Sequence, residues 1–256
     1  MKQHTLSAVM VLCLMIVPIA AFAVDINYPD FSDLSDFTLG ANAQLLNSVP
    51  DDILQLASGP SQRSGYAYLT NQIQLENTFS TYFSFRIDNN VGGGDSDGLG
   101  ADWLMFLLKR EIGYLAAEDV AVEFDIFNNG ARDNNSGNHV GINYGGEFVV
   151  TQHIDQRFND GDIWHVWIDY DGSFLKVYIS LTALKPATPV LSHAVDISLY
   201  FSDTDPDPYI GFQAASGSYG ADFAILSWSF ESTACETCLE DTMAPSGSVH
   251  AYLYIT

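Results

Sequence analysis

The 256-residue chain carries little positive charge, because 9 Lys and Arg residues stand against 32 Asp and Glu residues and give a formal net charge of −23. A surface this acidic repels the phosphate backbone, so we expect no nucleic acid partner. Hydrophobic residues make up 47% of the chain and aromatic residues 13%, a composition that excludes intrinsic disorder and can form a large core. The excess carboxylates supply oxygen ligands for hard cations.

Cysteine is scarce, with three residues in the whole chain. Cys13 belongs to residues 1–23, where Lys2 precedes an apolar run that ends in the A-x-A pattern Ala-Phe-Ala. This pattern predicts a signal peptide that is cleaved after Ala23 and takes Cys13 with it. In an exported protein, the remaining pair in CETC predicts a disulfide between Cys235 and Cys238.

Hydrophobic runs of membrane-spanning length are missing after residue 23. We therefore expect no membrane insertion, and a secreted or periplasmic protein. The short signal favours bacterial export. The mature chain is predicted to form one domain over residues 24–231, followed by a C-terminal tail over residues 232–256 that contains the CETC pair.

Long helical periods are absent as well, and short strand patterns take their place. Residues 73–87 alternate, with Phe79, Phe83 and Phe85 among the apolar residues of one face. The dipeptide Asp171-Gly172 predicts a hairpin turn. Further strand patterns cover residues 104–108, 120–127, 163–170, 174–180, 195–201, 209–215 and 224–230. Many short strands with polar turns predict an all-β fold, an antiparallel β-sandwich.

One strand and its loop carry candidate metal ligands. In the strand pattern at 120–127, alternation sends Glu123 and Asp125 to one face, where two carboxylates repel each other unless a cation or a proton lies between them. Oxygen ligands suit Ca²⁺, whereas carboxylates with one imidazole suit Mn²⁺ or another transition metal. The first set of candidates is Glu123, Asp125, Asp133 and His139 for a transition metal, and the second is Asp125, Asp133, Asn129 and the Phe127 carbonyl for calcium. The alternative is a solvated acidic strand followed by ordinary Asp- and Asn-rich turns.

This segment resembles the metal-binding stretch of the legume lectins, or L-type lectins. Five other pieces occur in the order of that family: INYPDFSDLSDFTL, TNQIQLENTFSTYFSFRI, Gly100-Ala101-Asp102, GDIWHVWIDYDGSFLKVYIS, and GFQAASGSYGADFAILSWSF. The resemblance covers most of the chain after residue 23. It implies a concanavalin-like jelly-roll sandwich that binds carbohydrate without catalysing a reaction.

The resemblance also implies roles for individual residues. Asp102 would accept hydrogen bonds from sugar hydroxyls, and the Ala101–Asp102 peptide bond would be cis. Phe127 would stack on a sugar ring, and Asn129 would both bind calcium and donate to the sugar. The other implied carbohydrate-binding residues are Gly113, Ser218 and Tyr219. Trp103 replaces the glycine that usually follows the family's G-A-D, and members of the family pair into homodimers through flat sheet backs.

Two other function classes share features with this sequence. Laminarinase-like glycoside hydrolases use a related sandwich and the motif E-x-D-x-x-E, but the third acidic position here is Asn128, which cannot exchange the catalytic proton. No G-x-S-x-G is present either, so we expect no enzyme. A structural or adhesive sandwich that has lost sugar binding would lack some of the family's sugar-binding residues, whereas Asp102, Phe127 and Asn129 are all retained. The prediction is a secreted lectin dependent on Ca²⁺ and Mn²⁺ or another transition metal.

Overall fold

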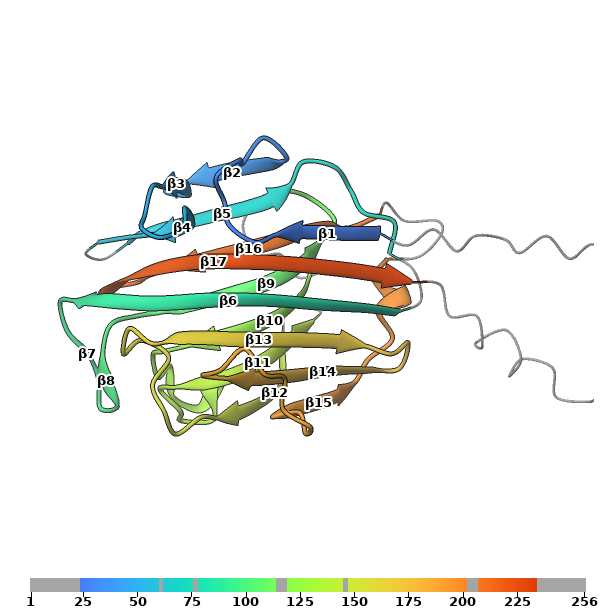
Figure 1. Ribbon diagram of the computed structural model, residues 1–256. Coiled ribbons are helices and arrows are strands. Elements are labelled where there is room, and N and C mark those ends of the chain that lie inside the picture. The colour runs from blue at the N-terminus through green and yellow to red at the C-terminus, as the bar shows by residue number, and fades with distance from the viewer. Residues whose placement is uncertain are drawn as a thin grey trace, which may run out of the picture.

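The chain folds into two antiparallel β-sheets packed face to face, as the computed structural model in Figure 1 shows. The structure describes residues 24–59, 62–75, 78–113, 119–144, 147–201 and 207–233. Both cysteines of the predicted disulfide, the predicted signal peptide and the tail beyond residue 233 lie outside these ranges.

The strand and 3₁₀-helix boundaries follow the chain order. They are β1 (Val24–Tyr28), β2 (Phe37–Ala41), β3 (Gln44–Leu46), β4 (Ile53–Ala57), β5 (Ser64–Leu69), β6 (Thr78–Val91), β7 (Gly94–Asp95), β8 (Gly98–Leu99), β9 (Trp103–Lys109), β10 (Val120–Asp125), η1 (Gly130–Asp133), β11 (His139–Tyr144), β12 (Glu147–His153), β13 (Ile163–Tyr170), β14 (Phe174–Ser180), β15 (Leu191–Ala194), η2 (Ile197–Leu199), β16 (Tyr209–Ala215) and β17 (Gly220–Thr233).

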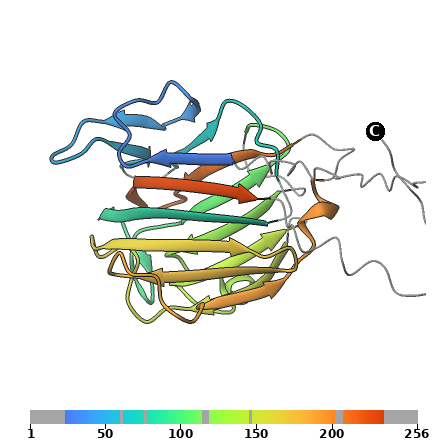
Figure 2. The same ribbon diagram turned by 45° about the vertical axis from the view of Figure 1, so that its right-hand side comes forward.

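The first sheet has the order β15-β14-β13-β6-β17-β4-β3 among the described strands, and β1 also pairs with β17. The long strand β17 makes this arrangement possible. It pairs with β6 along one edge, while its other edge pairs first with β4 and then with β1. Figures 1 and 2 show this sheet in front of the second one.

The second described sheet has the order β12-β11-β10-β9-β16-β5-β2. Its inner face packs on the first sheet through residues such as Phe106, Phe124 and Phe212, which lie around Phe83 of β6. Its outer face is also partly covered, since Met105 and Leu107 of β9 are buried there. The strand predicted at residues 104–108 is thus covered on both faces, as expected. The candidate site lies on this outer face.

Most predicted strands are present, and three match to the residue: β13, β14 and β16. The strand predicted from residue 73 begins later, at Thr78, and its apolar face is buried as expected. The prediction of a strand at 195–201 is wrong, because this segment forms η2. The Asp196 carboxylate accepts a hydrogen bond from the Ser198 N–H at 3.1 Å, and such a local bond closes a helical turn in place of a sheet ladder.

The two 3₁₀ helices of the described chain are short, and none of its helices has the length and apolar character that a membrane span needs. The sheet ends at Thr233, two residues beyond the predicted domain boundary at 231.

Candidate metal centre and binding pocket

Three candidate ligands meet on the outer face of the second sheet. Alternation along β10 buries Val122 and Phe124 in the core and sends Glu123 and Asp125 to the opposite face. The antiparallel register of β11 places His139 directly across from Asp125. One ligand atom from each of Glu123, Asp125 and His139 lies within 4.8 Å of the other two, and all three residues are buried.

Three buried polar atoms of this group lack hydrogen-bond partners in the described structure. His139 Nε2 lies 4.0 Å from Glu123 Oε2, and neither that oxygen nor either ring nitrogen has a hydrogen-bond partner within the described structure. Burial raises the pKa of Glu123 to about 8 and the pKa of Asp125 well above its usual range, and it lowers the pKa of His139. Buried polar groups without partners are costly, and a divalent cation would satisfy a carboxylate–imidazole set of this kind. The residues therefore fit a transition metal ion.

The metal loop, residues 126–138 between β10 and β11, brings further oxygen donors to these ligands. Asp133, buried in η1, accepts a hydrogen bond from the backbone N–H of Asn129. The negative charge of Asp133 contributes to the raised pKa of both Glu123 and Asp125. Its carboxylate is therefore close enough to interact electrostatically with both. Asp125 Oδ1 in turn accepts from the Phe127 N–H at 2.6 Å. The carboxylates of Asp125 and Asp133 beside a loop of carbonyl and amide oxygens suit Ca²⁺.

Asp102 lies next to this loop, in the segment before β9. The peptide bond between Ala101 and Asp102 is cis. The Asp102 carbonyl accepts from the Ile126 N–H at 2.8 Å, and its own N–H donates to the Ala215 carbonyl at 3.0 Å. Burial raises the pKa of the Asp102 carboxyl to about 6, against the lowering effect of the Gly217 N–H. A Cβ on Gly217 would lie 2.7 Å from Asp102 Oδ2, so any larger residue at this position would displace the Asp102 carboxylate.

Two aromatic rings belong to the segments that contact Asp102, since Phe127 follows Ile126 and Tyr219 lies two residues after Gly217. The centroids of Phe127 and Tyr219 lie 6.2 Å apart with an interplanar angle of 48°, and both rings are half-buried. Gly93 lies under Tyr219, because a Cβ there would come within 2.6 Å of the ring. Ser218, between Gly217 and Tyr219, is exposed. A partly exposed aromatic surface beside a carboxylate is what a pyranose requires, since the sugar has an apolar C–H face and paired hydroxyls.

For the remaining predicted residues, the structure gives position and exposure but no contact with the pocket. Asn129 is exposed at the start of the metal loop, and Trp103 is half-buried at the start of β9. Gly113, with a φ of +152°, directly precedes residues 114–118, which lie outside the described structure. Its role in binding stays a prediction.

The hairpin β7–β8 contributes two residues that we did not predict. Asp95 Oδ2 accepts from the Asn128 N–H at 2.6 Å, and Asp97 Oδ2 accepts from the Gly137 N–H at 2.8 Å. These two carboxylates fix the metal loop near its beginning and its end. The Asp-Ser-Asp triplet is visible in the sequence, but its partners lie more than 30 residues away and become apparent only in the fold.

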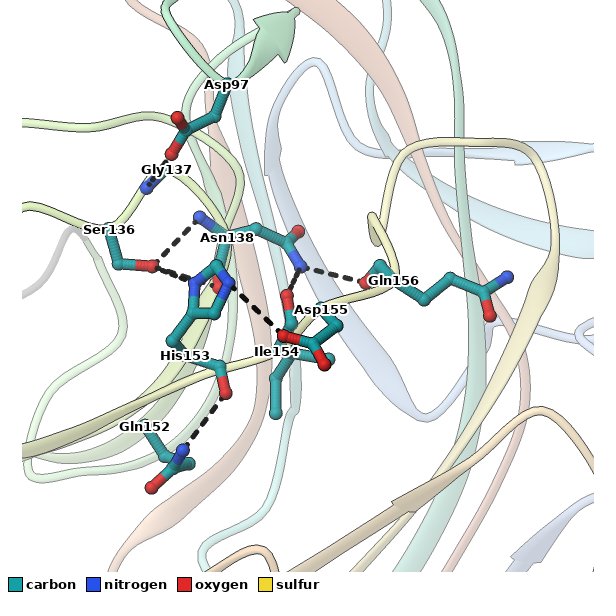
Figure 3. Close-up of polar contacts among 9 residues, drawn as sticks. All are labelled: Asp97, Ser136, Gly137, Asn138, Gln152, His153, Ile154, Asp155 and Gln156. Atoms are coloured by element: carbon teal, nitrogen blue, oxygen red, sulfur yellow. Dashed lines mark hydrogen bonds and ion pairs between the residues drawn. The ribbon is translucent and has the colours of Figure 1, made fainter.

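A Ser–His–Asp arrangement includes Ser136 near the end of the metal loop, as Figure 3 shows. Ser136 Oγ is 2.7 Å from His153 Nδ1, and His153 Nε2 is 3.7 Å from Asp155 Oδ1. The Ser136 hydroxyl is nevertheless buried and donates to the Asn138 carbonyl, and the Asp155 side chain is fully exposed. A nucleophile needs access and an oriented base, so this geometry is structural rather than hydrolytic.

Comparison with known proteins identifies the family. The profile of the Legume lectin domain matches residues 23–245, which is most of the chain. The chain belongs to the legume lectin domain family. Similar curated proteins include the L-type lectin-domain containing receptor kinases VIII.2 and VIII.1 of Arabidopsis thaliana. The first is 29% identical over 229 residues and the second 30% over 233 residues, which cover 78% and 80% of this chain.

Each alignment covers 32% of the receptor kinase, so this lectin-family chain spans about a third of the length of these relatives. Solved lectins share the fold over nearly their whole length. The winged bean acidic lectin complexed with methyl-α-D-galactose has a TM-score of 0.68 at 23% identity and covers 83% of this chain and 99% of its own. The Bauhinia forficata lectin in complex with GalNAc has a TM-score of 0.63 at 25% identity, with coverage of 82% and 98%.

Proposed function

We propose that this legume lectin domain binds carbohydrate in a shallow pocket at Asp102, and that Ca²⁺ and a transition metal ion order the pocket. The observation that carries the proposal is the set of buried, partnerless atoms of Glu123 and His139, on the two strands that flank the loop that bears Phe127. Such a set is costly unless a cation completes it. Its position makes the binding loop depend on the ion.

In this proposal, one set of residues binds the metal ions and another binds the sugar. Glu123, Asp125, Asp133 and His139 hold the transition metal, and Asp125, Asp133, Asn129 and the Phe127 carbonyl hold calcium. When bound, the ions supply positive charge and fixed coordination to the loop. Asp102 accepts hydrogen bonds from sugar hydroxyls while Phe127 stacks on the ring, with Tyr219 beside it. No residue acts as acid, base or nucleophile, so binding is reversible and no bond is broken.

A structural or adhesive sandwich without sugar binding is the second candidate. The arrangement of Asp102 against Gly217 argues against this candidate, because partial burial of a charged carboxylate costs free energy unless a ligand compensates for it. A sugar whose hydroxyl groups donate hydrogen bonds to the carboxylate would compensate for this cost.

Export and dimerisation belong to the proposal as well. We propose that residues 1–23 direct secretion or periplasmic export and are removed, and that Cys235 and Cys238 form a disulfide. The outer face of the first sheet carries Tyr82 and Trp167 side by side, with ring centroids 5.3 Å apart, and the exposed Phe174. This face would support a homodimer, which sedimentation of the mature protein would reveal.

The direct test is a glycan array probed with purified mature protein, first with calcium and manganese and then with EDTA. We expect binding to a group of related sugars that disappears with EDTA and returns when both metals are added. Binding that persists in EDTA would contradict the metal mechanism. No binding in either condition would favour the structural candidate.

The variant Asp102→Asn locates the pocket. It keeps the size of the side chain but removes its charge, and charge-assisted hydrogen bonds contribute about 1.5–3 kcal/mol each. We therefore expect glycan affinity to fall roughly ten- to a hundredfold, with metal affinity unchanged. Asp169→Asn is the matched control, since Asp169 pairs with Ser80 and Lys185 on the outer face of the first sheet. An equal loss in both variants would place the sugar elsewhere.

A further inference from the structure

The guanidinium of Arg157 joins three segments of the candidate site. Arg157 lies between β12 and β13. Its Nη1 donates to the Gly137 carbonyl at 3.0 Å, and its Nη2 donates to the carbonyls of Ile126 at 3.1 Å and Leu99 at 3.5 Å. Ile126 begins the metal loop, Gly137 lies near its end, and Leu99 leads into the segment that contains Asp102. One side chain thus bridges both ends of the metal loop and the Asp102 segment.

The guanidinium is itself held in position. Its Nε donates to Asn159 Oδ1 at 3.0 Å, and the Asn159 amide donates to the Leu99 carbonyl at 2.6 Å and to Asn90 Oδ1 at 2.7 Å. A Cβ on Gly98 would lie 3.0 Å from Arg157 Cζ, so the glycine leaves room for the planar group. The orientation of Arg157 is therefore fixed by the buried Asn159, which is itself held by the half-buried Asn90 of β6, and by the space that Gly98 of β8 leaves.

Asn138 fastens the same segment to the end of the metal loop (Figure 3). Its Nδ2 donates to the carbonyls of Ile154 at 2.7 Å and Gln156 at 2.8 Å, and its Oδ1 accepts from the Phe158 N–H at 3.0 Å. The backbone on either side of Arg157 is consequently attached to the loop that Arg157 bridges.

We propose that Arg157 is a positioning residue, which sets the spacing between the metal loop and the Asp102 segment and thereby the affinity for metal and glycan. This inference rests on the proposed function. Each hydrogen bond described for Arg157 ends on a carbonyl or amide oxygen, although the chain has 32 acidic residues. Its role is therefore geometric rather than charge-neutralising. The planar guanidinium uses three separate nitrogens to reach these acceptors, whereas lysine carries all three of its donors on one nitrogen.

The test compares Arg157→Lys and Arg157→Gln with the wild-type protein. Calcium and manganese affinities are measured by calorimetry on EDTA-stripped protein, and glycan affinity is then measured at limiting and at saturating metal. Residues that orient metal ligands typically alter affinity 10- to 100-fold. We expect a loss of about this size for metal in both Arg157 variants, and glycan binding that recovers as the metal saturates. Lysine should not rescue, because it keeps the charge but not the fork.

Arg86→Lys and Arg86→Gln are the matched controls. Arg86 is half-buried and pairs with Asp88 at 3.0 Å, on the outer face of the first sheet. These variants should leave both affinities unchanged. The unfolding temperature of each stripped variant separates a positioning role from a general structural one, which would lower that temperature and leave metal affinity intact.

The outcomes are distinguishable. Wild-type metal affinity in both Arg157 variants, or full rescue by lysine, would overturn the positioning role. Equal losses in the Arg86 variants would overturn it too. A wild-type protein that binds metal but no glycan would overturn the proposed function, and the metal affinities alone would then decide the role of Arg157.

Discussion

At the scale of single residues, the site combines groups that a folded protein does not bury without compensation. Glu123 and His139 lie 4.0 Å apart in a buried place, each with atoms that have no hydrogen-bond partner in the described structure. A water-filled or solvated acidic face would not raise the pKa of Glu123 to about 8. The residue pair thus fits the proposed ion better than it fits solvent.

The raised pKa predicts how the metal-free protein responds to pH. Between the unfolded pKa of Glu123, about 4.5, and its folded pKa, about 8, the folded state holds a proton that the unfolded state has released. Stability therefore falls as the pH rises through this window. The lowered pKa of His139 acts in the opposite direction below pH 6.5. The clearest window is about pH 6.5 to 8, where the unfolding temperature in EDTA should decline.

Calcium and manganese should reverse this trend, because they bind the deprotonated carboxylates and stabilise the fold more strongly as the pH rises. Glu123→Gln should flatten the decline in EDTA and remove most of the response to manganese. Differential scanning fluorimetry at half-unit pH steps measures both effects. An unfolding temperature in EDTA that rises from pH 6.5 to 8 would contradict the assignment.

At the scale of elements, β17 holds the sandwich together. Trp228 of this strand donates its indole N–H to Thr81 Oγ1 at 2.9 Å and packs edge-on against Phe212 of the opposite sheet, with centroids 5.2 Å apart. Tyr28 of β1 stacks on the same indole. One side chain therefore connects β1, β6 and β17 with the second sheet.

Trp228→Ala should lower the free energy of unfolding by about 3–5 kcal/mol, the usual result of emptying a buried aromatic site. Trp167→Ala is the matched control. It removes the same side chain from the half-buried outer face of the first sheet, where a loss of about 1 kcal/mol is typical. Urea titration of both variants in EDTA gives the comparison. Equal losses would mean that Trp228 does not organise the core.

The elements also show what the sequence can predict. Strands with strict alternation and a clear turn, such as Ile163–Tyr170 and Phe174–Ser180, match to the residue because local pattern and tertiary packing agree. The segment at 195–201 has apolar residues of strand type, but Asp196 caps a helical turn. Short edge strands such as β3 have no periodicity of their own, and their register comes from their neighbour β4.

The same distinction holds for the site. Alternation on one strand suffices to place Glu123 and Asp125 together, and the family resemblance supplies Asp102. Arg157 and Asp95 carry no local signal, since their partners are backbone groups of loops that are distant in sequence. The sequence therefore predicts groups that would touch metal or sugar, whereas those that hold the loops require the fold.

At the scale of the whole molecule, the formal net charge of −23 destabilises the compact state through self-repulsion. Salt screens this repulsion, because the Debye length shortens from about 30 Å at 0.01 M to about 8 Å at 0.15 M. The metal-free protein should accordingly unfold at a higher temperature in 0.15 M NaCl than in 0.01 M NaCl.

Screening and site binding are separable in the same experiment. At constant ionic strength and pH 7.5, calcium with manganese at millimolar concentration should raise the unfolding temperature further, since the proposed site exists in the folded state alone. Magnesium is the control, because it demands small octahedral coordination and sheds water reluctantly, so it should act as ordinary salt. A shift with magnesium as large as that with calcium and manganese would mean that the carboxylates respond to charge density over the surface, and that Glu123, Asp125 and His139 hold no specific ion.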